Sequence, residues 1–541
     1  MAHGSRHIVA FALAAVVGIA AAAGGYAVIR HFDLLGGRPT KPGEPRAVTV
    51  SLTPATPAWE ERKPAEAPSE PIAAQRFGAA EFAGPQQSAA LADPSAVSTP
   101  PPPTVAPELP APPQAPSAPG PDSPAANAPP PNSLAYLPPE PAVPPQPQPQ
   151  PVVAVPPPHA GLSILHIGDS HTSADFFTGA IRKLLQTRYG VGGPGYVVAG
   201  LPANVMSEAF EIEATPGWTY SAIQRSSDIA DFTLSGFNSA AAKAGETLTF
   251  AAHQPVAYDT IEVEALQRPG GGMVEIRADG VLICRCSLEA TAPQRTAFRM
   301  IRPPGAPETF RRLTISTVDD RPVVISSLGV YKAGGIAYSP VGFPGATVDI
   351  LNKFEPALLN DELQRLAPQL IVLSFGTNEA DNDGIDIARY RQKYLAVIDK
   401  IRRALPAAVL VMILPPDGER FSEHCKGQGP TADCRPNPPG GPQALLADKA
   451  CAWHTIPNLA LVRDTQRQIA ENEKIPTWDW SEMTATTCGA HAWVKSTPKL
   501  MSPDHVHFTI EGYRRSAERF VQFLTLILEA NSLVPNAVSN N

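Results

Sequence analysis

The sequence lacks Cys-x-x-Cys pairs, and it lacks an excess of basic residues. Without such cysteine pairs a structural zinc site is not expected, and we expect no metal or other cofactor. Its 43 Lys and Arg face 51 Asp and Glu, which gives a net charge of −8. The chain therefore has no positive field for binding nucleic acid. The glycine-rich run at residues 190–195 follows an expected helix rather than a strand, which argues against a dinucleotide-binding loop.

Charged residues are also missing from residues 8–29, which are rich in Ala, Val and Ile. A membrane-spanning helix needs about 20 such residues, so residues 1–30 are expected to be a membrane anchor, or else a cleaved signal segment. Basic residues are more frequent after this run than before it, which alone mildly favours a cytoplasmic C-terminal side. The cysteines and motifs described below outweigh that count. We expect a periplasmic protein held at the inner membrane by this helix, or exported after cleavage.

The chain has six cysteines: Cys284, Cys286, Cys425, Cys434, Cys451 and Cys488. The last four lie in one stretch, and their even number favours disulfides in an oxidising compartment. We expect the pairs Cys425–Cys434 and Cys451–Cys488, with four free buried thiols as the alternative. The first two alternate on an expected strand, so they face the same side and need not be bonded.

Apolar periodicity is missing from residues 31–160, where more than half of the chain's 63 prolines lie. This Pro- and Ala-rich segment is expected to be a disordered, extended tether. A spacer of this kind suits a domain that works on a polymer at some distance from its anchor, and a passive linker is the alternative. Residues 531–541 are expected to be a disordered tail.

Folded sequence begins near residue 161. Short buried strands are expected at residues 162–167, 370–375 and 409–414, and helices at residues 173–189, 387–405 and 509–528. Strands that are apolar throughout and alternate with helices predict an α/β fold, in which helices flank a parallel sheet on both faces. This α/β domain is expected over residues 161–225 and 336–530.

Helical periodicity is absent between these two parts, over residues 226–335. Runs that look like strands occur at residues 247–252, 260–266, 273–278, 281–286, 312–317 and 323–330. Gly270-Gly271-Gly272 and Asp279-Gly280 are turn signals between them. The pattern predicts an all-β sandwich inserted into the α/β domain.

Two motifs follow buried strands. Ser170, in Gly168-Asp169-Ser170-His171, lies where the first strand ends, and catalytic groups of α/β sheets gather at these ends. Taken alone, this turn is equally a helix N-cap. Asn378, in Gly376-Thr377-Asn378-Glu379, follows another buried strand and carries an N–H group that can stabilise an oxyanion. An asparagine that merely ends a strand is the alternative.

The third motif, Asp504-His505-Val506-His507, comes just before the last helix. Its spacing can place Asp504 and His507 on one loop, where His507 deprotonates Ser170 and Asp504 orients the imidazole. His505 is expected to point elsewhere if His507 points in. The alternatives are an aspartate that caps the helix and a metal site made of Asp504, His505 and His507, for which no further ligand cluster is evident.

Together these motifs resemble the SGNH/GDSL hydrolase superfamily, whose order of Gly-Asp-Ser, Gly-x-Asn and Asp-x-x-His they follow. The Gly-Asp-Ser-His and Gly-Thr-Asn-Glu forms, with a β-sandwich before a glycine block, resemble peptidoglycan O-acetylesterases and their O-acetyltransferase relatives. The resemblance implies that Ser170, Asp504 and His507 are catalytic. It also implies an oxyanion hole made of the backbone N–H groups of Ser170 and Gly345 and the side chain of Asn378. Pro344 departs from the relatives, which tend to have a polar residue before the glycine.

We therefore expect a serine esterase of the cell envelope that deacetylates peptidoglycan or another acetylated glycan through an acyl-enzyme. The sandwich resembles a carbohydrate-binding module, and it either holds the polymer or only supports the active site. One alternative is an O-acetyltransferase to a glycan hydroxyl, which would need a membrane partner as acetyl donor. The other is a non-catalytic glycan-binding envelope protein.

Overall fold

The computed structural model describes residues 161–535, apart from residues 228, 422–424, 426–433, 438–450 and 485–486. The expected anchor and tether, and the greater part of the expected tail, lie outside the described residues. Within the described part, no helix is both long enough and apolar enough to cross a membrane.

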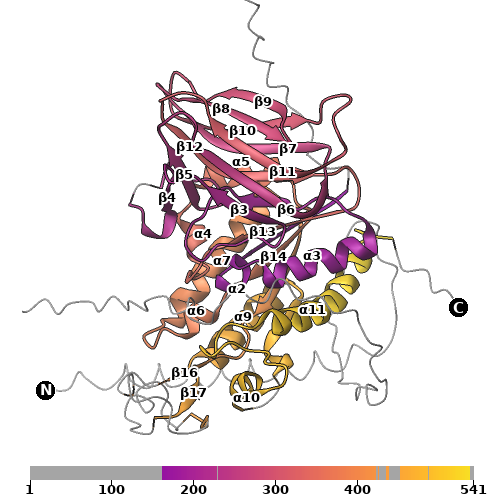
Figure 1. Ribbon diagram of the computed structural model, residues 1–541. Helices are drawn as coiled ribbons and strands as arrows, with labels where there is room; N and C mark the ends of the chain where they lie inside the picture. The colour runs from indigo at the N-terminus through magenta and orange to yellow at the C-terminus, as the bar shows by residue number, and fades with distance from the viewer. Residues whose placement is uncertain are drawn as a thin grey trace, which may run out of the picture. The chain divides into compact units, whose positions relative to one another are not determined.

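Five parallel strands form one sheet in the order β13-β1-β14-β15-β18. Their bounds are β1 (Leu162–Gly168), β13 (Ile336–Gly342), β14 (Leu370–Ser374), β15 (Val409–Leu414) and β18 (Thr477–Asp479). On one face, α3 (Phe176–Tyr189) and α11 (Ile510–Ala530) lie side by side (Figure 1). The other face is covered by α5 (Pro356–Leu366), α7 (Ile387–Ala404) and α9 (Leu459–Glu473). Because both faces are covered, the neighbours Ile164 and Leu165 are both buried, one on each face, and the expected α/β fold is confirmed.

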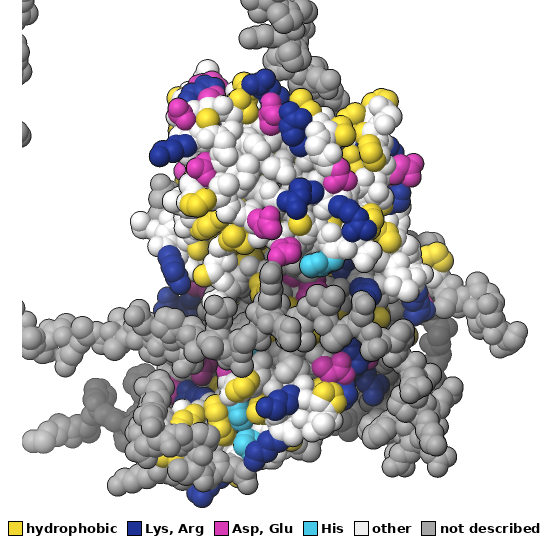
Figure 2. All heavy atoms as spheres, viewed as in Figure 1, with side chains coloured by type: hydrophobic (Ala, Val, Ile, Leu, Met, Phe, Trp, Pro, Cys, Tyr) yellow, Lys and Arg dark blue, Asp and Glu magenta, His cyan; other side chains and the backbone are white. Residues whose placement is uncertain are grey.

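Two antiparallel sheets lie between β1 and β13 in the sequence, and we call them the β insert. One has the order β10-β7-β12-β5-β4, with β2 also paired to β12, and the other has the order β3-β6-β11-β8-β9. The strands are β2 (Gly195–Val198), β3 (Phe210–Ala214), β4 (Thr219–Ala222), β5 (Phe237–Ala241), β6 (Thr247–Ala257), β7 (Thr260–Gln267), β8 (Met273–Ala278), β9 (Val281–Ser287), β10 (Gln294–Ile301), β11 (Thr309–Thr317) and β12 (Val323–Tyr331). Residues of both sheets, such as Phe250 and Val263, share one apolar core. On the face shown in Figure 2, acidic and basic side chains are interspersed over this insert.

The antiparallel sheets begin before residue 226, where the insertion was expected to start. β2, β3 and β4 precede that residue and pair with β12, β6 and β5. These three strands are short, and whether such a run joins a sheet depends on partners that are remote in the sequence. The start of the insert predicted from the sequence, residue 226, therefore lies after the first strands of its sheets.

The disulfides differ from the expected pairing. Cys425 bonds to Cys451 and Cys434 bonds to Cys488, so the expected Cys425–Cys434 and Cys451–Cys488 pairs are wrong. Strand β16 (Glu419–Phe421) pairs with β17 (Trp453–Thr455), which brings the chain after β16 beside the chain before β17. The β16–β17 pairing explains the Cys425–Cys451 disulfide, because Cys425 follows β16 and Cys451 precedes β17 at the same end of the two strands. Cys284 and Cys286 on β9 are also bonded to each other.

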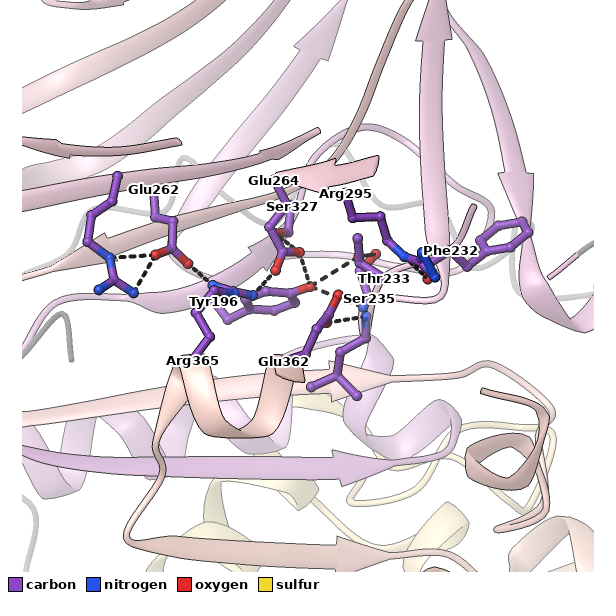
Figure 3. Close-up of polar contacts among 12 residues, drawn as sticks. Tyr196, Phe232, Thr233, Ser235, Glu262, Glu264, Arg295, Ser327, Glu362 and Arg365 are labelled. Atoms are coloured by element: carbon purple, nitrogen blue, oxygen red, sulfur yellow. Dashed lines mark hydrogen bonds and ion pairs between the residues drawn. The ribbon is translucent and has the colours of Figure 1, made fainter. Parts of the chain in front are cut away.

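Helix α5 meets the β insert through charged side chains. Arg365 bonds to Glu262 and to Glu264, which lie on the same face of β7 (Figure 3). Both carboxylates are buried. Glu262 also pairs with Arg299 at 2.7 Å, and Glu264 accepts a hydrogen bond from the Tyr196 hydroxyl at 2.6 Å. Arg365 thus joins α5 to a buried, mutually bonded polar network of the insert.

Glu362 lies on the same helix and is also buried. It accepts a hydrogen bond of 2.5 Å from the backbone N–H of Leu234. A cavity of about 480 Å³ lies beside it, lined also by Arg295 and Arg365. Burial raises the pKa of Glu362 from its usual 4.5 to about 8.

This pKa predicts how stability depends on pH. The folded chain holds the Glu362 proton more tightly than the unfolded chain does, so its contribution is complete below pH 4.5 and is lost as the pH rises toward 8. The loss is on the order of 5 kcal/mol. In urea unfolding at a series of pH values, Glu362→Gln should reduce the pH dependence by this amount, and Glu308→Gln, at an exposed position, should leave it unchanged. An unchanged slope in Glu362→Gln would show that this carboxyl is ionised when buried.

Candidate active site

Ser170 begins the short helix α2 (Ser170–Ser173), directly after β1 ends. Asp169 caps this helix, because its carboxylate accepts a hydrogen bond of 3.0 Å from the backbone N–H of His171. The turn needs glycine at position 168, where a Cβ would lie 2.1 Å from the Thr172 hydroxyl oxygen. Ser170 is half-buried and lies at the carboxyl end of β1. The sequence predicted this position at the end of a buried strand.

The structure brings Ser170, His507 and Asp504 into one hydrogen-bonded chain. His507 Nε2 lies 2.9 Å from Ser170 Oγ, and His507 Nδ1 lies 2.7 Å from Asp504 Oδ2. The other carboxylate oxygen of Asp504 accepts the backbone N–H groups of Val506 and His507, each at 3.0 Å. The loop before α11 is therefore folded around the Asp504 carboxylate, which fixes the imidazole that faces the serine.

Asp504 and His507 each shift the pKa of the other so that the charged form is favoured. Burial lowers the pKa of His507, but the hydrogen bond and charge of Asp504 outweigh burial, and the pKa of His507 is raised. Burial raises the pKa of Asp504, but the His507 ring and two backbone N–H groups outweigh it, and the pKa of Asp504 is lowered. An ionised Asp504 and a more basic imidazole suit His507 to take a proton from Ser170.

The His505 side chain points away from the hydrogen-bonded Ser170, His507 and Asp504. Its backbone adopts a positive φ of 59°, and its Nδ1 lies 2.7 Å from Glu419 Oε2. The ring is buried and does not join Asp504 and His507. A shared metal site of Asp504, His505 and His507 is therefore not formed, and the expectation that the two histidines diverge is confirmed.

The two other oxyanion candidates lie in contacting segments. Gly345 has a positive φ of 71°, and a Cβ placed there would meet open space, so backbone conformation alone demands glycine. The Asn378 side chain donates a hydrogen bond of 2.9 Å to the carbonyl of Ala346. The loop is also tied to β1, because the Phe343 N–H donates to the Gly168 carbonyl at 2.9 Å. One N–H of the Asn378 amide thus holds the glycine loop, and the second has no acceptor among the described residues.

Glu379 is a site residue that the sequence marked only as part of the Gly-Thr-Asn-Glu form, without a derived chemical role. It follows Asn378 in α6 (Thr377–Ala380) and is buried. Its Oε1 accepts a hydrogen bond of 2.8 Å from the backbone N–H of Val348. Burial raises the pKa of Glu379 to about 7. Asn378 and Glu379 together hold the loop that carries Gly345, and in the sequence only the position of Glu379 next to the Gly-x-Asn motif pointed to this.

His171 is a second such residue. Its Nδ1 lies 2.9 Å from the Tyr513 hydroxyl, and its ring centroid lies 5.3 Å from that of His507 and 5.3 Å from that of Trp480. Burial lowers the pKa of His171 to about 3. The ring therefore stays neutral and supports His507 from one side without placing a second positive charge next to it.

Two substitutions of Glu379 test whether its acceptor oxygen positions the glycine loop. Glu379→Ala removes the acceptor for the Val348 N–H and should lower kcat about 10- to 100-fold, less than the loss of an oxyanion donor itself. Glu379→Gln retains an acceptor oxygen of the same shape and should keep kcat within about threefold of the wild type. Steady-state kinetics on an acetyl ester separates kcat from KM. Equal losses in both variants, or a change in KM alone, would contradict this positioning role.

Comparison with known proteins finds a family and solved structures that are similar to this chain. Residues 328–515 match the GDSL-like Lipase/Acylhydrolase family. A solved structure described as a peptidoglycan O-acetylesterase in action is 26% identical, with a TM-score of 0.54, over 68% of this chain and 92% of its own. No curated protein matches the chain.

Two carbohydrate esterases of family two are also similar, but too distantly to support an argument. The one from Clostridium thermocellum is 13% identical over 58% of this chain and 99% of its own, with a TM-score of 0.25. The one from Cellvibrio japonicus is 14% identical over 60% of this chain and 99% of its own, with a TM-score of 0.23. On the family match and the first of these structures, the chain is a serine carboxylic ester hydrolase of the SGNH type that resembles peptidoglycan O-acetylesterases.

Proposed function

We propose that the chain removes O-acetyl groups from a glycan, peptidoglycan first, through an acetyl-enzyme on Ser170. The observation that carries the proposal is the chain of hydrogen bonds from Ser170 Oγ through His507 to Asp504. A nucleophile, a base and a group that orients the base are the components that acyl transfer requires.

The reaction follows from these positions. His507 Nε2 takes the Ser170 proton as Oγ attacks the acetyl carbon, and the carbonyl oxygen becomes an oxyanion. The backbone N–H groups of Ser170 and Gly345 and the Asn378 amide stabilise that charge. His507 then gives its proton to the sugar oxygen, which leaves as a hydroxyl. Water, deprotonated by the same imidazole, releases acetate and restores Ser170.

An acetylated glycan is the proposed substrate because the solved structure with the TM-score of 0.54 is described as a peptidoglycan O-acetylesterase. The β insert fits this proposal as a module resembling those that bind carbohydrate, contributed by the same chain. Two disulfides in the α/β part favour an oxidising compartment, which suits a periplasmic enzyme. A periplasmic reporter fused after residue 160 should be active, and an inactive reporter would contradict export.

The test uses the full chain with O-acetylated peptidoglycan, the same polymer after chemical deacetylation, and acetylated xylan. Free acetate should appear fastest from the first, and the deacetylated polymer should give none. Adding an unacetylated glycan acceptor should leave acetate as the main product. Formation of acetylated acceptor in place of acetate would show that the enzyme is an acetyltransferase. Faster release of acetate from acetylated xylan would show that peptidoglycan is not the preferred substrate.

A further inference from the structure

Three side chains that can bind a metal converge beside the catalytic loop. They are Glu419 on β16, His491 on α10 (Gly489–Lys495), and His505 between Asp504 and His507. One ligand atom from each lies within 4.8 Å of the other two. The three residues come from segments far apart in the sequence, so only the fold brings them together.

Glu419 lies at the centre of this cluster. It is 1% exposed, and its Oε2 lies 2.7 Å from His505 Nδ1. Its Oε1 accepts the backbone N–H of His491 at 3.1 Å, and its own N–H donates to the His505 carbonyl at 2.9 Å. Its partners in the described part of the chain are therefore a histidine ring and backbone groups. A buried carboxylate is stable only when it is paired or coordinates a metal.

The histidine rings are already fixed in place. Trp453 on β17 stacks flat on His505, with ring centroids 3.6 Å apart and an interplanar angle of 7°. The His491 ring centroid lies 5.2 Å from that of His505. A histidine whose one ring nitrogen bonds to a carboxylate is the usual arrangement of a metal ligand, because the carboxylate fixes the tautomer and makes the other nitrogen more basic.

We propose that Glu419, His491 and His505 bind one divalent transition-metal ion of the zinc class. Two imidazoles and one carboxylate are a ligand set that zinc uses, with a fourth position left for water. Magnesium and calcium prefer oxygen ligands, so the two nitrogens disfavour them. This site was not expected from the sequence, because the ligands have no short-range spacing.

The disulfide between Cys434 and Cys488 restricts the ligand set. Both sulfur atoms lie within 4.8 Å of a Glu419 carboxylate oxygen. While they are bonded to each other, neither offers a thiolate. Cys488 also precedes the first residue of α10, so the disulfide holds the helix that carries His491. Binding experiments therefore need the oxidised protein.

The proposal does not depend on the proposed function. Zinc binding is measured without turnover, and Ser170→Ala should bind zinc as tightly as the wild type. The ion would join β16, α10 and the loop of Asp504 and His507, and its proposed ligands include neither Ser170 nor His507. Failure of one proposal therefore leaves the other standing.

The experiment is equilibrium dialysis of the full chain against Zn²⁺, after removal of metals with EDTA, without a polyhistidine tag and without reductant. The wild type should bind one ion per chain. His491→Ala, which changes a half-buried residue, should bind at least about 100-fold more weakly. The matched control His253→Ala, at an exposed position on β6, should bind as the wild type does. A wild type that binds no ion, or a His491→Ala variant that binds equally well, would overturn the proposal.

Thermal unfolding gives a second readout that does not depend on any variant. Zinc at about 100 times its Kd should raise the wild-type Tm by about 3 °C. Mg²⁺ at the same concentration should raise it by less than about 1 °C. An equal shift with both ions, or no shift with zinc, would contradict a site built from two imidazoles and a carboxylate.

Discussion

Replacing Ser170 by alanine should lower kcat on an acetyl ester about 10⁴- to 10⁶-fold. The variant loses the atom that would carry the acetyl group, while the residues that hold the site remain. His507 Nε2, 2.9 Å from Ser170 Oγ, then has no hydroxyl to deprotonate. The remaining rate should come from oxyanion donors that polarise the ester toward water. Hydrolysis of p-nitrophenyl acetate measures the loss directly.

The size of the loss tests whether Ser170 and His507 act as a unit. His507→Ala should cost about as much as Ser170→Ala, and the double variant should cost little more than either, because each loss already disables the nucleophile. Ser221→Ala, at an exposed position on β4, is the matched control and should retain wild-type kcat. Losses that multiply in the double variant would mean that the two residues act separately.

Replacing Arg365 by leucine should lower the free energy of unfolding by about 3–5 kcal/mol. Arg365 lies between Glu262 and Glu264, which are 1% and 3% exposed. Without it Glu262 keeps Arg299, but among the described residues Glu264 keeps only the hydroxyls of Tyr196 and Ser327. A buried charge that has lost its partner is strongly destabilising.

Denaturant unfolding measures this effect, and two further variants control it. Arg403→Leu removes an exposed helical ion pair with Asp399 and should cost less than about 1 kcal/mol. Adding Glu264→Gln to Arg365→Leu should recover part of the loss, because it removes the unpaired charge. A cost below about 1 kcal/mol for Arg365→Leu would show that the carboxylates at this junction are solvated or protonated.

The sequence predicted the parts of the fold whose signal is local. The strands near residues 162, 370 and 409 are apolar throughout because both faces of the parallel sheet are covered, and helices α3, α7 and α11 carry apolar residues at helical spacing. Among the site residues, the geometry places Ser170, Asp504 and His507 in contact. Their order in the chain and their positions at element ends were visible without the structure.

What the sequence could not predict depends on contacts between distant segments. β13 contains Pro340 and ends in Gly342, so its sequence is a weak signal for a strand. It nevertheless pairs along the whole length of β1. The disulfide pairing depends on the β16–β17 ladder, and the junction at Arg365 depends on a helix and a strand about 100 residues apart in the chain. The role of Glu379 depends on where the Val348 N–H lies, which no motif records.

Ser170 is the residue proposed to carry the acetyl group, and covalent labelling tests this role most directly. A fluorophosphonate should add one adduct per chain, and peptide mapping should place it on Ser170. Ser170→Ala should take up none, and His507→Ala should react far more slowly because its serine is no longer activated. An adduct on another residue, or equal labelling of wild type and Ser170→Ala, would show that Ser170 is not the nucleophile.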